Sequence, residues 1–180
     1  MTSTWFRPRS VDGGVDEIPL PRSPGRLWLC GKHAVAPDPE AAIAHLDADA
    51  VVCLNPAREL EYHFPSYVAW LRAEAGDRAV WYPIDDLSAP GLETVRPLLV
   101  GLHQRLGAGG RLLVHCGAGI GRAGTTAVAL CILDGMSLEQ ALTHVRAHRP
   151  MAGPEVGSQM DLVHALDAER VVNRGGPAGG

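Results

Sequence analysis

The sequence predicts a three-layer α/β/α fold, in which helices cover both faces of a central, mainly parallel sheet. Short apolar runs with the length of buried strands alternate with segments whose apolar residues recur at helical spacing. Such alternation is typical of parallel sheets, because the crossover connections place helices on both faces. The 180 residues show no internal repeat and no linker between halves, and this length fits one domain with a full core.

The two ends of the chain differ in composition from the predicted domain between them. Residues 1–25 are rich in Pro, Gly, Arg and Asp without periodicity, so we expect an irregular arm, tied down near Ile18 and Leu20. The folded domain is expected over residues 26–172. The sequence from Asn173 onward is rich in glycine, which predicts a disordered tail over residues 173–180.

The first half of the domain contains three predicted strands. They are residues 26–30, 50–54 and 79–82. Between the first two, Asp38 as N-cap and Pro39 at the first helical position predict the start of a helix. Residues 58–75 are predicted to be helical in part, with an interruption near Pro65.

The second half contains one more predicted strand among helices. Leucine and valine recur at helical spacing over residues 92–106, and the apolar run Leu112–Val114 is short enough for a buried strand. An alanine-rich apolar segment then predicts a buried helix that ends at Asp134-Gly135. Two further helices are expected, one that begins with a capping box at Ser137 and Gln140 and one that begins at Pro154.

Composition and charge restrict the partners. The formal net charge of −4 argues against nucleic acid as the main partner, because a nucleic-acid site needs a basic cluster. No apolar stretch approaches the roughly 20 residues of a membrane span. Arg7 and Arg9 are not followed by an apolar segment, so the N-terminus does not resemble a signal peptide. The sequence leaves the oligomeric state open.

The cysteines and histidines give no metal-binding pattern. The four cysteines, at positions 30, 53, 116 and 131, lack zinc-site spacing, and three of them lie in apolar runs as expected core residues. A reduced, cytoplasmic protein is therefore the simplest prediction. His144 and His148 are spaced i, i+4, but the sequence offers no third ligand, so we expect surface residues and no metal.

The stretch with the clearest chemistry follows the strand at Leu112–Val114. His115 and Cys116 come first, then a glycine-rich loop over residues 117–121 that ends in Arg122 before the buried helix. A strand, a glycine loop and a helix N-terminus together form a typical anion site, because backbone N–H groups and the helix dipole favour negative charge. With a thiol at one end and a guanidinium at the other, the loop predicts a phosphate cradle that contains a nucleophile.

Two other nucleotide-binding patterns fit this loop less well. Residues 119–124 match G-x-G-x-x-G, which is found in dinucleotide-binding domains. Such domains place an acidic residue about 20 positions later at the end of a strand, whereas here residues 137–148 are a predicted helix and position 144 is His. No Gly-Lys-Ser/Thr follows the loop, which disfavours a nucleoside triphosphate site.

The stretch from His115 to Arg122 matches H-C-x5-R, the signature loop of the protein tyrosine phosphatase superfamily. The chain resembles its small dual-specificity branch over residues 24–166, including an R-x-x-R-P element at residues 146–150. The resemblance implies a dual-specificity phosphatase-like fold, with residues 26–172 as the catalytic domain. It implies no cofactor and no metal.

The resemblance also implies roles for the loop residues. Cys116 would be the nucleophile that forms a cysteinyl-phosphate, and the positive loop favours its thiolate form. Arg122 would hold two phosphate oxygens with its planar fork. His115 would order the loop. The phosphate would be bound by the backbone of the intervening residues, Gly117, Ala118, Gly119, Ile120 and Gly121.

A general acid must protonate the leaving oxygen, and the candidates are Asp85 and Asp86, which follow the strand at residues 79–82. Related sequences read P-I-x-D with a proline four residues past the Asp. Pro83 and Pro90 fit that register for Asp86, which is our choice. The other Asp is then a turn or helix-cap residue.

One position departs from the family pattern. Relatives have Ser or Thr directly after the signature arginine, where this chain has Ala123, so we expect the cysteinyl-phosphate to be hydrolysed more slowly than it forms. Thr125 is a nearby hydroxyl candidate. Gln159 resembles a glutamine that orients the attacking water in some relatives, and Glu155 matches an acid in the same region of others. Each could equally be an ordinary helix residue.

The loop composition bears on the substrate. Relatives that act on phosphoinositides carry basic residues within the loop, but residues 117–121 are all Gly, Ala or Ile. This favours a phosphoprotein, phosphotyrosine first, with phosphoserine and phosphothreonine accepted if loops near residues 58–63 and 150–158 leave the pocket shallow. Phosphoinositides and RNA 5′-phosphates are less favoured. The alternative is a pseudophosphatase that binds phosphoproteins without turnover.

Overall fold

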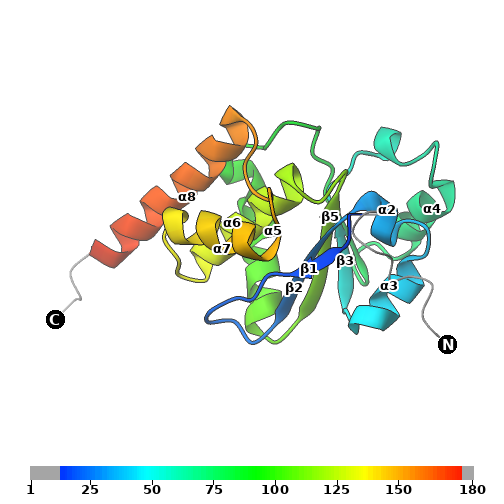
Figure 1. The fold of residues 1–180 in the computed structure, drawn as a ribbon, viewed down its shortest axis with the longest axis horizontal. Helices are drawn as coiled ribbons and strands as arrows, with labels where there is room; N and C mark the ends of the chain where they lie inside the picture. The colour runs from blue at the N-terminus through cyan, green and yellow to red at the C-terminus, as the bar shows by residue number, and fades with distance from the viewer. Residues whose placement is uncertain (1–12, 176–180) are drawn as a thin grey trace.

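The computed structural model describes residues 13–175, which form a five-stranded sheet between two layers of helices (Figure 1). The strands are β1 (Val15–Glu17), β2 (Arg26–Gly31), β3 (Ala50–Cys53), β4 (Ala79–Trp81) and β5 (Arg111–Cys116). Their order across the sheet is β1-β2-β5-β3-β4, and only β1 runs antiparallel to its neighbour. The predicted α/β class with a mainly parallel sheet is confirmed.

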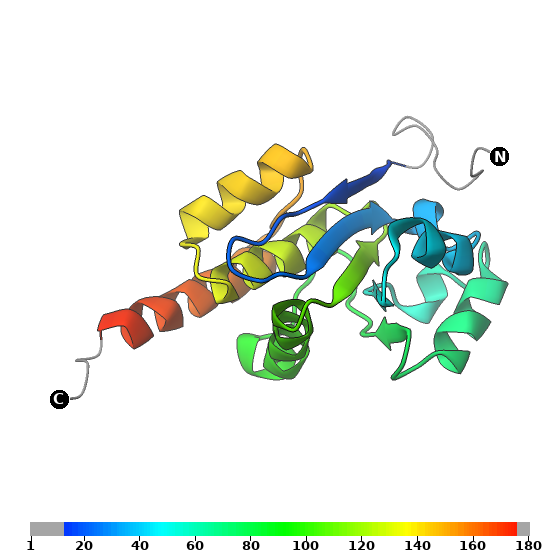
Figure 2. The ribbon, with the colours of Figure 1, turned by 90° about the horizontal axis from the view of Figure 1, so that it is seen from below.

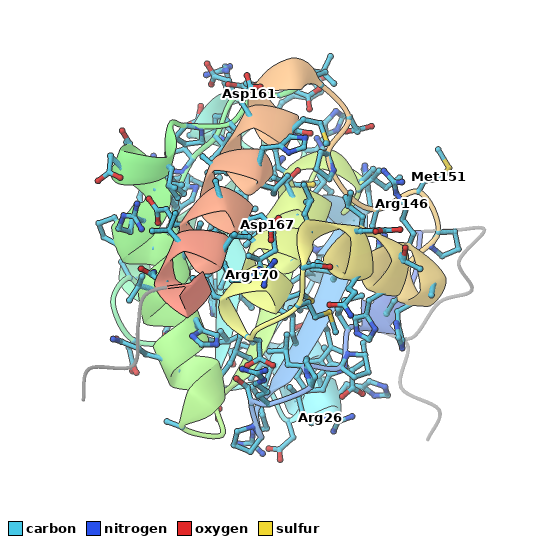
Figure 3. All side chains as sticks on the ribbon, turned by 90° about the vertical axis from the view of Figure 1, so that its left-hand side faces the viewer. Arg26, Arg146, Met151, Asp161, Asp167 and Arg170 are labelled. Carbon is cyan, nitrogen blue, oxygen red and sulfur yellow. The ribbon has the colours of Figure 1, made fainter. Side chains whose placement is uncertain are left out.

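The helices divide between the two faces of the sheet (Figures 1 and 2). One face is covered by α2 (Lys32–Val35), α3 (Pro39–Leu46) and α4 (Pro65–Ala73), with the short 3-10 helix η1 (Ala57–Glu59) before α4. The other is covered by α5 (Leu92–Gly107), α6 (Gly121–Leu133), α7 (Leu138–His148) and α8 (Gly157–Gly175). Figure 3 looks onto α7 and α8, where Asp167 and Arg170 form an ion pair along α8.

The side chains of β5 alternate between two apolar cores. Leu112 and Val114 belong to the core beneath α5, α6, α7 and α8, whereas Leu113 belongs to the core beneath α2, α3 and α4. Helix α6 is buried along almost its whole length, because it lies between the sheet and the outer helices α7 and α8. The loop between β5 and α6 therefore joins the two most enclosed elements of the fold.

Several local signals are confirmed in the structure. The Asp38 side chain accepts a hydrogen bond from the amide of Ala41 at the start of α3. Ser137 and Gln140 form the predicted capping box of α7. The helical segment is interrupted before Pro65, as predicted: η1 ends at Glu59, and Pro65 occupies the first turn of α4, where an N–H would have no helical partner.

Two predicted boundaries differ from the structure. The arm is not irregular throughout, because β1 pairs with β2 and the buried Ile18 continues this pairing with a hydrogen bond from its amide to the carbonyl of Leu27. Helix α8 begins at Gly157 rather than Pro154, and it continues through Gly175 into the predicted tail. The remaining parts of the predicted arm and tail, residues 1–12 and 176–180, lie outside the described residues.

A buried carboxylate at the end of α6 holds the segment between β1 and β2. Asp134 accepts hydrogen bonds from the Ser23 hydroxyl (2.5 Å) and the Arg22 amide (2.7 Å), and it contacts Nε2 of His103 at 3.2 Å. Burial alone would raise the pKa of Asp134, but these hydrogen bonds outweigh burial and leave the pKa below its ordinary value. Within residues 13–175, no helix is both long and apolar enough to cross a membrane.

We expect Asp134→Asn to lower the free energy of unfolding at pH 7 by about 1–3 kcal/mol, because three partly buried hydrogen bonds lose their charged acceptor. The folded-state pKa lies below the unfolded one, so this contribution is complete above the ordinary Asp range and is lost as the pH falls through it. Urea unfolding of the wild type and of Asp134→Asn should therefore show a difference in the free energy of unfolding that becomes smaller below about pH 4. Equal stability at pH 7 would contradict this role.

Candidate active site

A cavity of about 410 Å³ opens over the loop between β5 and α6, at the carboxyl end of the sheet. Cys116 closes β5 with only 3% of its surface exposed. The residues that line the cavity are Lys32, Glu59, Asp86, Leu87, Cys116, Gly117, Ala118, Ile120, Gly121, Arg122 and Glu155. The structure thus brings together the predicted nucleophile, arginine and acid, whose segments lie far apart in the sequence.

The loop is fitted closely onto the end of β2. The carbonyl of Gly117 accepts a hydrogen bond from the Lys32 amide at 3.1 Å. Gly119 has a φ of +72°, and a Cβ there would lie 2.3 Å from the carbonyl oxygen of Cys30. Only glycine combines this backbone conformation with so close an approach, which explains the glycine at the centre of the loop.

Arg149, at the end of α7, holds the outer side of the loop. Its Nε donates to the carbonyl of Gly119 (2.8 Å) and its Nη2 to that of Ala118 (2.9 Å). Its Nη1 forms an ion pair with Asp16 in β1 at 2.7 Å. Arg149 does not line the cavity, so the two carbonyl oxygens point away from the space where an anion would sit. The sequence placed Arg149 in the R-x-x-R-P element without assigning it this contact.

Arg122 is buried on the inner side of the loop and is held by the loops that follow β3 and β4. Its two Nη atoms donate to the two carboxylate oxygens of Glu59, at 2.8 and 2.9 Å. Nη1 also donates to the carbonyl of Ile84 (2.8 Å), and Nη2 lies 3.1 Å from the Asp86 carboxylate. Burial would lower the pKa of Arg122, but its negative neighbours, Glu59 first, raise it, so the guanidinium stays charged.

The motifs of the sequence did not point to Glu59 or Lys32, which also line the cavity. Glu59 is itself fixed, because Nδ2 of Asn55 donates to its carboxylate at 2.6 Å and Nζ of Lys32 donates to its carbonyl at 2.9 Å. The only signal for Glu59 was its place in the chain. It follows β3, and β3 neighbours β5, so the loops after these parallel strands meet at one edge of the sheet.

The two acid candidates occupy different surroundings. The carboxylate of Asp86 lines the cavity next to Arg122, although 71% of the side chain is exposed. Asp85 is turned outward and pairs with the exposed Arg58 at 2.6 Å. The geometry therefore favours Asp86 over Asp85 as the group that can reach a bound ligand.

His115 is completely buried and is not among the residues that line the cavity. Its Nε2 is 2.6 Å from the hydroxyl of Tyr67 in α4. Burial lowers the pKa of His115 to about 3, so the ring is neutral at physiological pH. A neutral ring tied to the α4 layer agrees with an ordering role and cannot supply positive charge to the loop.

The remaining candidates from the sequence differ in whether they line the cavity. Glu155 lines the cavity, whereas Gln159 is fully buried and does not line it. Thr125 is buried one turn into α6, and its hydroxyl has no hydrogen-bond partner among the described residues. Ala123 is fully buried in the core, and the expected slow second step stays a prediction.

A thiol at the end of a central parallel strand, a glycine loop and a buried arginine at the helix start define the class of cysteine-dependent phosphatases. Residues 23–171 match the family model described as "Swiss Army Knife protein, DSP-PTPase phosphatase domain". This match covers most of the chain, which therefore belongs to the PTP-SAK family. The resemblance to the dual-specificity branch is confirmed.

Individual relatives agree with this assignment. The chain is 30% identical to Tk-PTP in its active form, covering 82% of this chain and 97% of that one with a TM-score of 0.62. It shares its fold with kinase associated phosphatase (TM-score 0.71, 22% identity, 87% and 95% covered). Protein phosphatase Slingshot homolog 3 of Mus musculus is 33% identical over 105 residues, which is 58% of this chain but only 15% of that protein.

We expect Glu59→Gln to lower kcat/KM for an aryl phosphate by about tenfold or more, because Arg122 would lose the carboxylate that fixes its orientation. The free energy of unfolding should fall by about 1–3 kcal/mol, as a buried guanidinium loses its partner. Glu61→Gln is the matched control, since among the described residues Glu61 forms an exposed ion pair with Arg72 at 3.6 Å and does not line the cavity. Steady-state kinetics and urea unfolding in which the two variants behaved alike would contradict the role of Glu59.

Proposed function

We propose that this protein is a phosphomonoester hydrolase that dephosphorylates phosphoproteins, phosphotyrosine first, through a cysteinyl-phosphate intermediate. The observation that carries the proposal is the convergence of Cys116, Arg122 and Asp86 on one cavity over a glycine loop. Membership of the PTP-SAK family supports it, as do relatives named as protein phosphatases. The family match over residues 23–171 also supports a catalytic domain close to the predicted residues 26–172.

In the first step, the Cys116 thiolate attacks phosphorus on the side opposite the leaving oxygen. A sulfur–phosphorus bond forms as the phosphorus–oxygen ester bond breaks, and the leaving oxygen takes a proton from the Asp86 carboxylic acid. Arg122 and the loop amides hold the three remaining oxygens, where negative charge accumulates. Lysine in place of Arg122 could not bind two of these oxygens with a planar fork.

In the second step, water attacks the same phosphorus atom and the sulfur–phosphorus bond breaks. The water proton passes to the Asp86 carboxylate, which restores the acid, while inorganic phosphate leaves and the thiolate is regenerated. Asp86 thus acts first as an acid and then as a base. Its position beside Arg122 and at the solvent boundary of the cavity suits both roles.

The charges around the cavity support a substrate with a single phosphate. Lys32 and Arg122 are the lining cations, and Arg122 is already paired with Glu59. Asp86 and Glu155 add negative charge at the opening. These carboxylates would repel the additional phosphates of a phosphoinositide or an RNA end. A phosphorylated side chain brings only one phosphate and avoids this repulsion. Cys53, Cys116 and Cys131 are buried free thiols, which supports a reducing, cytoplasmic setting.

Cys116→Ser should abolish turnover of a chromogenic aryl phosphate, because the hydroxyl is a far weaker nucleophile than the thiolate. The variant should still bind inorganic phosphate, which isothermal titration measures, since the loop and Arg122 remain. A wild-type protein that bound phosphate but turned over no phosphopeptide or aryl phosphate would instead be a phosphate-binding module.

Asp86→Asn should lower kcat/KM for phenyl phosphate, which has a poor leaving group, by about 100-fold or more. Asp85→Asn is the matched control and should leave kcat/KM close to the wild-type value, because Asp85 pairs outward with Arg58. Steady-state rates for the three proteins decide between the two carboxylates. If Asp85→Asn caused the larger loss, the assignment of Asp86 would be wrong.

A further inference from the structure

The fully buried amide of Gln159, in the first turn of α8, bridges two segments that border the cavity. Its Oε1 accepts a hydrogen bond from the amide of Glu155 at 2.7 Å, and its Nε2 donates to the carbonyl of Ser88 at 3.3 Å. We propose that Gln159 is a positioning residue that holds the loop carrying Asp86 over the glycine loop of residues 117–121, which is called the phosphate loop from here on. This inference rests on the proposed phosphatase function.

The loop that carries Asp86 is held at two carbonyls, one on each side of the acid. Two residues before it, the carbonyl of Ile84 accepts from Arg122 at 2.8 Å. Two residues after it, the carbonyl of Ser88 accepts from Gln159. Asp86 is thus the midpoint of a short span whose ends are fixed by buried side chains from α6 and α8.

The backbone between these anchors adopts an unfavourable conformation. Leu87 has a φ of +52°, in the left-handed region, and 59% of its surface is exposed. This region is unfavourable for a residue with a side chain, because Cβ comes too close to the backbone, and the exposed Leu87 side chain has little packing to offset that strain. The anchors therefore have to maintain the shape of the loop, and Gln159 is the anchor on the side of Leu87.

Gln159 also lies beside the start of α6, where the phosphate loop ends. A Cβ on Gly121 would lie 3.4 Å from Nε2 of Gln159 and even nearer to the Glu155 carboxylate. The amide of Gly153 donates to the carbonyl of Ile120 at 3.2 Å, which fixes the segment before α8 against the phosphate loop. Gln159 therefore connects the Asp86 loop to the structure that holds the phosphate.

This placement differs from the role suggested by the family resemblance. A glutamine that orients the attacking water needs a free amide that faces the cavity. Both polar ends of Gln159 are bound to backbone groups, and the residue does not line the cavity. Gln159 is thus expected to act on the first chemical step through Asp86, and not on the water of the second step.

The test is kcat/KM for aryl phosphates with good and poor leaving groups, in the wild type and in Gln159→Met. The value of kcat/KM reports the first chemical step, in which Cys116 is phosphorylated. In that step only poor leaving groups need a proton from the general acid. We expect a loss of about tenfold or more for phenyl phosphate and less than about twofold for 2,4-dinitrophenyl phosphate. Gln159→Glu, which keeps an acceptor for the Glu155 amide and loses the amide donor to Ser88, should show the same pattern if the Met variant fails to fold.

Two controls separate positioning from general damage. Ser23→Ala removes a hydrogen bond to Asp134 at the opposite end of α6 and should leave both rates unchanged. In the double variant Asp86→Asn/Gln159→Met, the Gln159 change should add less than about twofold to the Asp86 loss, because both act on one proton transfer. This coupling would not arise from a purely structural role.

Other outcomes would overturn the proposal. An equal loss for both leaving groups would indicate a general structural role. An unchanged kcat/KM with a larger burst of the phenol product would indicate slower dephosphorylation, and thus a water-orienting role. If the wild type turned over neither aryl phosphate, the proposed function itself would fail, and this result is distinct from a failure of the Gln159 assignment.

Discussion

Burial of the Arg122 guanidinium is the constraint around which the site is organised. A cation can remain charged inside a protein only if acceptors surround it. The structure supplies two oxygens from Glu59 after β3, a carbonyl from Ile84 after β4, and the carboxylate of Asp86. The strand order β5-β3-β4 places the loop that precedes Arg122 next to the loops after β3 and β4. The topology of the sheet thus brings the acceptors to the buried guanidinium.

The phosphate loop lies between two arginines with opposite tasks. Arg122 faces the cavity, where its charge can act on an anion, whereas Arg149 binds loop carbonyls from behind. Peptide groups whose oxygens are occupied on one side are free to present their N–H groups on the other. Glycine gives the loop its conformational freedom, and the contacts of Arg149 with the loop carbonyls fix the orientation of the peptide groups.

The sequence predicted best what is encoded locally. The N-cap at Asp38 and the capping box at Ser137 depend on neighbouring residues, and only five residues lie between the thiol and the arginine of the loop. Contacts between distant segments were not predictable in this way. Glu59 lies 63 residues before its partner Arg122, and nothing in its neighbours marks it.

The misplaced boundaries have similar causes. Strand β1, three residues long, has no apolar alternation, and its pairing with β2 defines it. Pro154 resembles a helix start, but α8 begins only at Gly157, because the amide of Gly153 donates to the carbonyl of Ile120 and the side chain of Gln159 accepts from the amide of Glu155. In both cases tertiary contacts override the local preference.

The ion pair between Arg149 and Asp16 has a consequence for where the working unit begins. The family match starts at residue 23, yet Asp16 lies in β1, before that boundary. A chain trimmed to the family limits would keep every residue that lines the cavity. It would also leave the buried Arg149 without its carboxylate, and the loop carbonyls would lose a firmly held partner. The contacts that hold this loop therefore extend beyond the segment that the family model matches.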